Sequence, residues 1–113
     1  MGRYNCDSPE ILIETMIKRM MDRFGEPDII FLTGDLNAHY TAMVVDSPLD
    51  EDSTYSLLIS QHAGINHILT KHIPNAIILP ALGNNDSEFH DNPEPTSDSE
   101  WFYEYLYHLW FKL

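Results

Sequence analysis

Two short apolar runs constrain this sequence most strongly, because each ends at a glycine that is followed by a polar residue. The first run is "DIIFLTGD" (residues 28–35) and the second is "AIILPALGN" (residues 76–84). Apolar runs of this length that are rich in β-branched residues are typical of buried strands, often in a parallel sheet. A helical pattern lies between the two runs, so the sequence predicts a βαβ unit.

Helices are predicted on both sides of this unit. Ser8 and Pro9 form a helix start, with Ser8 as the N-cap and Pro9 at the first helical position. Gly25 and Pro27 end this helix. Its apolar residues recur at helical spacing, at Ile13, Met16, Ile17, Met20, Met21 and Phe24. After the second run, the aromatic-rich segment 99–111 is predicted to be a packing helix.

The helix between the two runs is predicted from its apolar face, which consists of Tyr55, Leu58, Ile59, Ile65, Ile68 and Leu69. Gly64 lowers the helix propensity of this segment. Two polar and acidic segments, residues 46–54 and 87–99, are predicted to be surface loops. No internal repeat or domain boundary is visible. We therefore expect one α/β domain over residues 1–113, made of one βαβ unit with flanking helices.

The charge of the chain limits its partners. Six Lys and Arg residues stand against 18 Asp and Glu residues, which gives a formal net charge of -12. Binding of nucleic acid through the protein's own charge is not expected, because phosphate contacts of that kind need Lys and Arg. If this protein handles phosphates, a metal cation must supply most of the positive charge.

The remaining global features concern the membrane and the redox state. No apolar run approaches the roughly 18 residues that a membrane span needs. The start "MGRYNCDSPE" lacks the apolar core of a signal peptide. The single cysteine, Cys6, is either a free thiol or one half of a bridge whose partner lies elsewhere.

Polar residues gather where the two predicted strands end. Asp35, His39 and Asn84 would each be unremarkable alone, as turn, cap or surface residues. Together they lie at the carboxyl ends of two parallel strands, where open α/β sheets bind ligands. Carboxylate and amide oxygens suit divalent cations, and a pair of such ions can clamp a phosphoryl group. The sequence therefore predicts a metal site with Asp35 and Asn84 among its ligands.

Several segments, in the same order, resemble a known family. "GDLNAH" and "GNND" look like two metal-binding blocks of calcineurin-like metallophosphoesterases, the second of which usually reads GNHD or GNHE. "GRYNCDSP", "EPDIIFLTGDLNAH", "ILPALGNND" and "YEYLYHLW" resemble segments of the acid sphingomyelinase-like phosphodiesterases and the related endopolyphosphatases. The resemblance covers nearly the whole chain and implies part of a metallophosphoesterase sandwich.

The resemblance implies a role for each matching residue. Asp35 would bridge two metal ions, zinc in this branch, and Asn84 would bind one of them. His39 would lie beside the substrate phosphate and stabilise the transition state. Cys6 matches a disulfide-bonded cysteine, which implies a secreted, lysosomal or vacuolar parent protein.

The chain departs from the family pattern in two ways. The upstream D-x-H block and the downstream G-H-x-H block are absent, so the chain reads as a partial domain with about two of the ligands. Zinc sites normally need three or four protein ligands, so we expect the chain alone to be inactive or weakly active. Asn85 also replaces the usual histidine. An amide cannot act as a general acid, although it can donate a hydrogen bond to a phosphoryl oxygen, and the endopolyphosphatase branch also carries GNND.

The expected function is therefore a fragment of a metal-dependent phosphoric ester hydrolase. Metal-activated water would attack a phosphodiester or phosphoanhydride in a lipid, nucleotide or polyphosphate. Asn85 and His39 are the predicted catalytic residues. The alternative is a non-catalytic remnant of the fold that serves as an interaction module. The other histidines match no motif and are interpreted as surface or helix-face residues: His62, His67, His72, His90 and His108.

Overall fold

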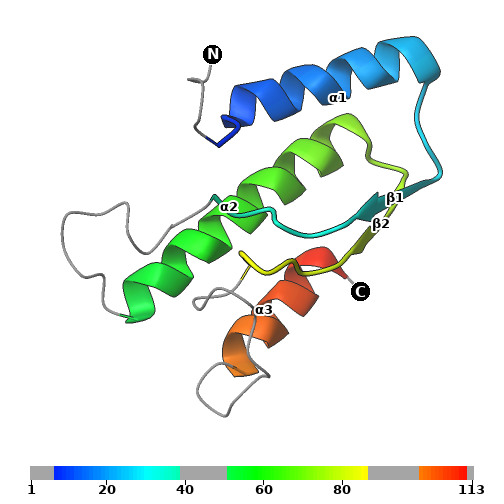
Figure 1. The fold of residues 1–113 in the computed structure, drawn as a ribbon. Coiled ribbons are helices and arrows are strands. Elements are labelled where there is room, and N and C mark those ends of the chain that lie inside the picture. Colours follow the sequence, from blue (N-terminus) through cyan, green and yellow to red (C-terminus); the bar gives the residue numbers. More distant parts are fainter. Residues whose placement is uncertain (1–6, 39–50, 87–99, 112–113) are drawn as a thin grey trace.

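The computed structural model describes residues 7–38, 51–86 and 100–111. Three helices and two strands alternate along the chain in the predicted order (Figure 1). They are α1 (Glu10–Phe24), β1 (Ile29–Leu32), α2 (Glu51–His72), β2 (Ile77–Pro80) and α3 (Glu100–Trp110). The predicted βαβ unit with flanking helices is confirmed, while the larger metallophosphoesterase sandwich stays a prediction.

The start of α1 differs from the prediction by one residue. Pro9 is the N-cap, with φ of -71° and ψ of 152°, and no side chain caps the helix. Ser8 is therefore not the cap and Pro9 is not the first helical residue. The Pro9 carbonyl accepts the first helical bond, from the Leu12 N–H at 2.9 Å, which an extended proline allows. Gly25 ends the helix as predicted, with φ of 79° and its N–H bound to the Met21 carbonyl.

Helix α2 is longer than the sequence predicts. It begins at Glu51, so residues 51–54 belong to the helix and the prediction of a loop there is wrong. Acidic residues are favourable in the first turn of a helix, which explains why a segment rich in them can start one. Gly64 lies inside the helix without breaking it. The other predicted loop, residues 87–99, lies outside the described residues.

The two strands form a parallel sheet, and the described helices cover only one of its faces. Their register runs from Ile29 opposite Ile77 to Leu32 opposite Pro80. Along both strands, exposed and half-buried residues alternate. The prediction of fully buried strands is therefore wrong for one face, because the described helices pack against the other.

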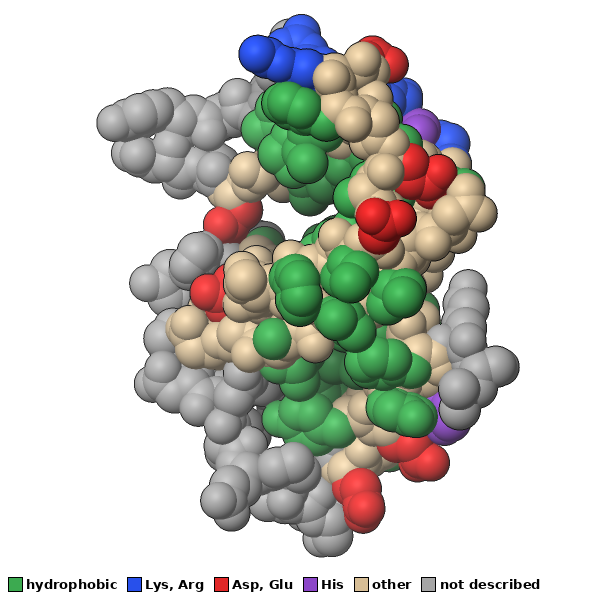
Figure 2. All heavy atoms as spheres, turned by 90° about the vertical axis from the view of Figure 1, so that its right-hand side faces the viewer, with side chains coloured by type: hydrophobic (Ala, Val, Ile, Leu, Met, Phe, Trp, Pro, Cys, Tyr) green, Lys and Arg blue, Asp and Glu red, His purple; other side chains and the backbone are tan. Residues whose placement is uncertain are grey.

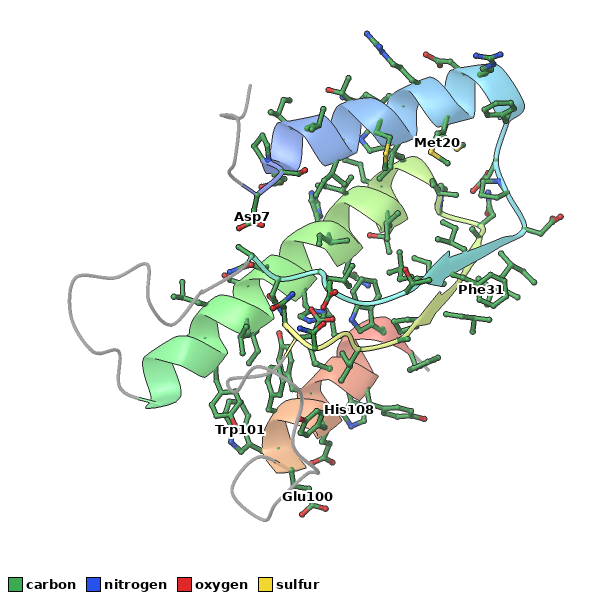
Figure 3. All side chains as sticks on the ribbon, viewed as in Figure 1. Asp7, Met20, Phe31, Glu100, Trp101 and His108 are labelled. Atoms are coloured by element: carbon green, nitrogen blue, oxygen red, sulfur yellow. The ribbon has the colours of Figure 1, made fainter. Side chains whose placement is uncertain are left out.

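The uncovered face is called the outer face below, and consists of Ile29, Phe31, Ile77 and Leu79. Phe31 is 72% exposed and its side chain points away from the helices (Figure 3). Hydrophobic side chains gather across the middle of the view in Figure 2.

Helix α2 is the centre of the packing, with α1 on one side and α3 on the other (Figure 1). The buried apolar core comes mainly from α2 and α3 and consists of Ile17, Tyr55, Leu58, Ile68, Leu69, Ile73, Phe102, Leu106 and Trp110. Glu14 on α1 pairs with His72 at 2.8 Å and Lys71 at 3.1 Å on α2. Hydrogen bonds from His72, Lys71 and Lys18 lower the pKa of Glu14 to about 2.

Candidate functional site

The two predicted ligand-bearing turns lie against each other. The backbone N–H of Asn85, after β2, donates to Asp35 Oδ1, after β1, at 3.0 Å. Asp35 and Asn84 are exposed, and Asn85 is half-buried. The structure thus brings residues 50 positions apart into one polar rim at the carboxyl ends of the strands. The metal-binding role of Asp35 and Asn84 and the catalytic role of Asn85 stay predictions, and His39 and Cys6 lie outside the described residues.

Two glycines allow this close approach. Gly34 has φ of 92°, and a Cβ atom there would collide with the backbone of Gly83. A Cβ atom on Gly83 would collide with the backbone N and the carboxylate of Asp35. Asp35 itself has φ of 54°, in the left-handed region that Asp tolerates better than most residues. The left-handed turn residue is therefore Asp35.

Asp86 joins the two turns from inside the protein. Its side chain is fully buried. Oδ2 accepts hydrogen bonds from the backbone N–H groups of Asp35 and Gly83, each at 2.7 Å. Oδ1 accepts from the N–H groups of Leu36 at 2.8 Å and Asn37 at 3.1 Å, and from Asn37 Nδ2 at 3.0 Å. One carboxylate therefore fixes the backbone on both sides of the predicted metal ligands.

Ionisation of Asp86 is favoured despite its burial. Burial acts to raise the pKa of this carboxyl, but the contact with His62 and the N–H groups of Gly83 and Asn37 lower it. The net result is a pKa below the ordinary value. A carboxylate that accepts several backbone hydrogen bonds is expected to stay charged.

His62 stands behind Asp86 and was missed by the interpretation of the histidines as surface or helix-face residues. It lies on α2, yet its side chain is fully buried. Its Nε2 is 3.5 Å from Asp86 Oδ1. Its Nδ1 accepts a hydrogen bond from Trp110 Nε1 on α3 at 3.3 Å. A series of polar side chains, which we call the polar chain, thus connects α3 through α2 to the turns that form the rim.

A cleft of about 500 Å³ opens beside the rim. Its wall comes from the N-terminal end of α1, the segment after β1 and the middle of α2. Asp7, Glu10 and Asp35 make part of this wall acidic. Asn37 also lines it, and its Oδ1 is buried without a hydrogen-bond partner in the described part of the chain. Gln61 Oε1 accepts from the Ala38 N–H at 2.7 Å, which ties the segment after β1 to α2.

The rim fits part of a metal site. Asp35 offers an exposed carboxylate and Asn84 an exposed amide, and both are hard oxygen donors that divalent cations accept. Within residues 7–38, 51–86 and 100–111, no group of three or more His, Cys, Asp or Glu side chains could hold a metal ion. The donors present are thus of the right kind but too few for a closed site.

Comparison with curated proteins relates nearly the whole chain to phosphodiesterases. It is 31% identical over 109 residues to the human protein "Acid sphingomyelinase-like phosphodiesterase 3b", which covers 96% of this chain. It is 30% identical, over the same share, to "Sphingomyelinase phosphodiesterase D" of Dictyostelium discoideum. The chain is a homologue of the acid sphingomyelinase-like phosphodiesterases. A more distant relative is "Sphingomyelin phosphodiesterase 2" of Caenorhabditis elegans, at 25% identity.

The relationship covers only one segment of these phosphodiesterases. The chain spans 22% of the length of the human and Dictyostelium proteins and 17% of the Caenorhabditis protein. No family model matches the chain. No solved structure matches it either. Within the described residues, no helix is both long and apolar enough to cross a membrane.

Proposed function

We propose that this chain is a segment of a metal-dependent phosphoric ester hydrolase and carries one rim of its active site. The observation that carries the proposal is the contact between Asp35 Oδ1 and the Asn85 N–H, which joins the two turns at the carboxyl ends of the strands. The phosphodiesterase relatives support the reaction class. The acidic surface is consistent with cation binding, since a net charge of -12 cannot by itself attract a phosphate ester.

Each residue of the rim has a distinct part in this proposal. Asp35 would bind through the carboxylate oxygen that does not accept the Asn85 N–H, and Asn84 would add an uncharged oxygen. A bound pair of divalent ions, zinc in the complete protein, would supply the positive charge and lower the pKa of a bound water. The Asn85 side chain would donate a hydrogen bond to a phosphoryl oxygen, and His39 would stand beside the phosphate.

By resemblance, the remaining ligands would come from the D-x-H and G-H-x-H blocks that this sequence lacks, because zinc sites need three or four. We therefore expect the 113-residue chain alone to be weakly active at most. The substrate would be a phosphodiester or phosphoanhydride, in a lipid, a nucleotide or a polyphosphate. The compartment would be secretory, lysosomal or vacuolar.

Metal content and hydrolysis of bis-p-nitrophenyl phosphate test this proposal. Both would be measured on the purified chain and on the longest polypeptide that its gene encodes. We expect zinc-dependent hydrolysis by the longer protein, lost on Asp35→Asn. Asp22→Asn, which changes an exposed acid on α1, is the matched control and should leave the rate unchanged. Hydrolysis that survives both zinc removal and Asp35→Asn would refute the proposed role of the rim.

A second candidate function is a non-catalytic interaction module. The observation that favours it is the outer face, where four apolar side chains of the sheet stand without cover from the described helices. Apolar patches of this kind often mark contact surfaces. Absence of metal-dependent hydrolysis in the longest gene product would favour this alternative.

A further inference from the structure

We propose that His62 and Trp110 are positioning residues of the candidate site, and that they act on its two turns through Asp86. His62 is fully buried, Trp110 is 8% exposed, and neither is among the residues that line the cleft beside the rim. The positioning role rests on the proposed function, because it assigns these residues to a hydrolase site. The contacts between Trp110, His62 and Asp86 do not depend on that function.

The first link fixes the proton on His62. The indole Nε1–H of Trp110 can only donate a hydrogen bond, so the His62 Nδ1 that receives it must be unprotonated. A neutral imidazole then carries its proton on Nε2. That atom lies 3.5 Å from Asp86 Oδ1, an electrostatic contact rather than a hydrogen bond, and no hydrogen-bond partner for it is found among the described residues. Trp110 therefore keeps the His62 proton on the nitrogen that lies beside the carboxylate.

The second link transmits this orientation to the rim. The Asp86 carboxylate is planar, so the direction of Oδ1 also fixes the direction of Oδ2. Oδ2 is the atom that holds one N–H from each turn, Asp35 and Gly83, both at 2.7 Å. A tilt of the carboxylate would lengthen these two bonds. Because the Asp35 backbone lies in the left-handed region, its side-chain direction depends on that support.

The burial of this polar chain argues for a specific role. Polar groups are costly inside a protein unless hydrogen-bonded, and Trp110 belongs to the buried apolar core. Apolar side chains would fill the same space without that cost. Partners that orient metal ligands from behind are known to affect metal affinity by about tenfold or more. Here the connected polar side chains lie on three elements, α3, α2 and the turn after β2.

The test uses Trp110→Phe, which removes the Nε1–H donor and keeps an aromatic ring in the core. Trp101→Phe is the matched control, because Trp101 lies on the same helix but is 45% exposed. Long-range ¹H–¹⁵N spectra near neutral pH would report which imidazole nitrogen of His62 carries the proton. Backbone amide spectra would report the turns, and a zinc titration would report metal affinity.

We expect wild-type His62 to be protonated on Nε2 and Trp110→Phe to give a mixture of tautomers. The amide signals of Asp35, Leu36 and Gly83 should then shift, and zinc affinity should fall about tenfold. Trp101→Phe should change none of these. His62→Gln retains an N–H donor in the side chain and should restore part of the zinc affinity that His62→Leu loses.

Two outcomes would separately refute the positioning role and the hydrolase function. If Trp110→Phe changes the tautomer while the amides of Asp35 and Gly83 stay in place, the positioning role is wrong. If the amides shift but neither the wild-type chain nor the longest gene product binds zinc, the coupling from α3 to the turns stands. The proposed hydrolase function then fails instead.

Discussion

Two regions of the same small sheet differ most in how far their side chains are exposed to solvent. At the carboxyl ends of β1 and β2, Asp86 is fully buried and accepts five hydrogen bonds. On the outer face of the same strands, Phe31 is 72% exposed and Ile77 is 59% exposed. The carboxylate of Asp86 is thus better buried than these apolar side chains, which reverses the usual distribution of polar and apolar side chains.

The difference shows what each region contributes to the chain. The turns after the strands are held by specific, directional bonds that leave Asp35 and Asn84 exposed at the rim. The outer face has no described partner, although strands of parallel sheets are normally covered on both faces. Changes at the polar end should therefore cost stability, whereas changes on the outer face should not.

The largest effect is expected for Asp86→Ala. This change leaves five donors without their acceptor, two in buried and three in part-buried hydrogen bonds, and should lower the free energy of unfolding by about 3–5 kcal/mol. Urea denaturation followed by circular dichroism would measure it. Asp22→Ala, on the exposed surface of α1, should change the free energy by about 0.5 kcal/mol or less. Equal effects at the two positions would contradict the role assigned to Asp86.

A smaller loss is expected for Gly83→Ala. The new methyl group would collide with Asp35, so the two turns must move apart, at a cost of about 1–3 kcal/mol. The matched control is Gly64→Ala in α2, where a Cβ atom meets nothing within 4 Å. Alanine is the better helix former, so this control should gain about 0.5–1 kcal/mol. Thermal melts of both variants would test the opposite signs, and stabilisation by Gly83→Ala would contradict the close packing of the turns.

The smallest effect is expected on the outer face. Phe31→Thr should change the free energy of unfolding of the chain by about 0.5 kcal/mol or less, because the ring is mostly in solvent. Phe102→Ala removes a ring of the same size that is fully buried, and should cost about 3–5 kcal/mol. A large loss for Phe31→Thr in urea denaturation would show that the outer face is covered in solution.

The order of elements could be predicted from the sequence because it depends on local patterns. The two apolar runs, the helical spacing around Ile17 and the glycine at position 25 each carry their information within a few residues. The covering of the sheet could not be predicted this way. A short apolar run looks the same whether one or both of its faces are buried.

Only the exposed residues of the candidate site could be predicted from the sequence. Asp35 and Asn84 follow strand ends, which is a signal that the sequence contains. The role of Asp86 depends on N–H groups from a turn about 50 residues away, and that of His62 on Trp110 in another helix. An acid directly after the second strand-end turn is the one local hint of Asp86. No local hint separates His62 from the exposed His67 on the same helix.

The proposed metal-binding rim is tested directly by locating a bound cation on the chain. Manganese ions added at low concentration broaden the amide signals of nearby residues in ¹H–¹⁵N spectra. We expect broadening to centre on the amides of Asp35, Asn84 and Asn85 and to disappear with Asp35→Asn. Broadening that follows the other exposed acids instead, and is unchanged by Asp35→Asn, would contradict the claim that the joined turns form a metal-binding rim.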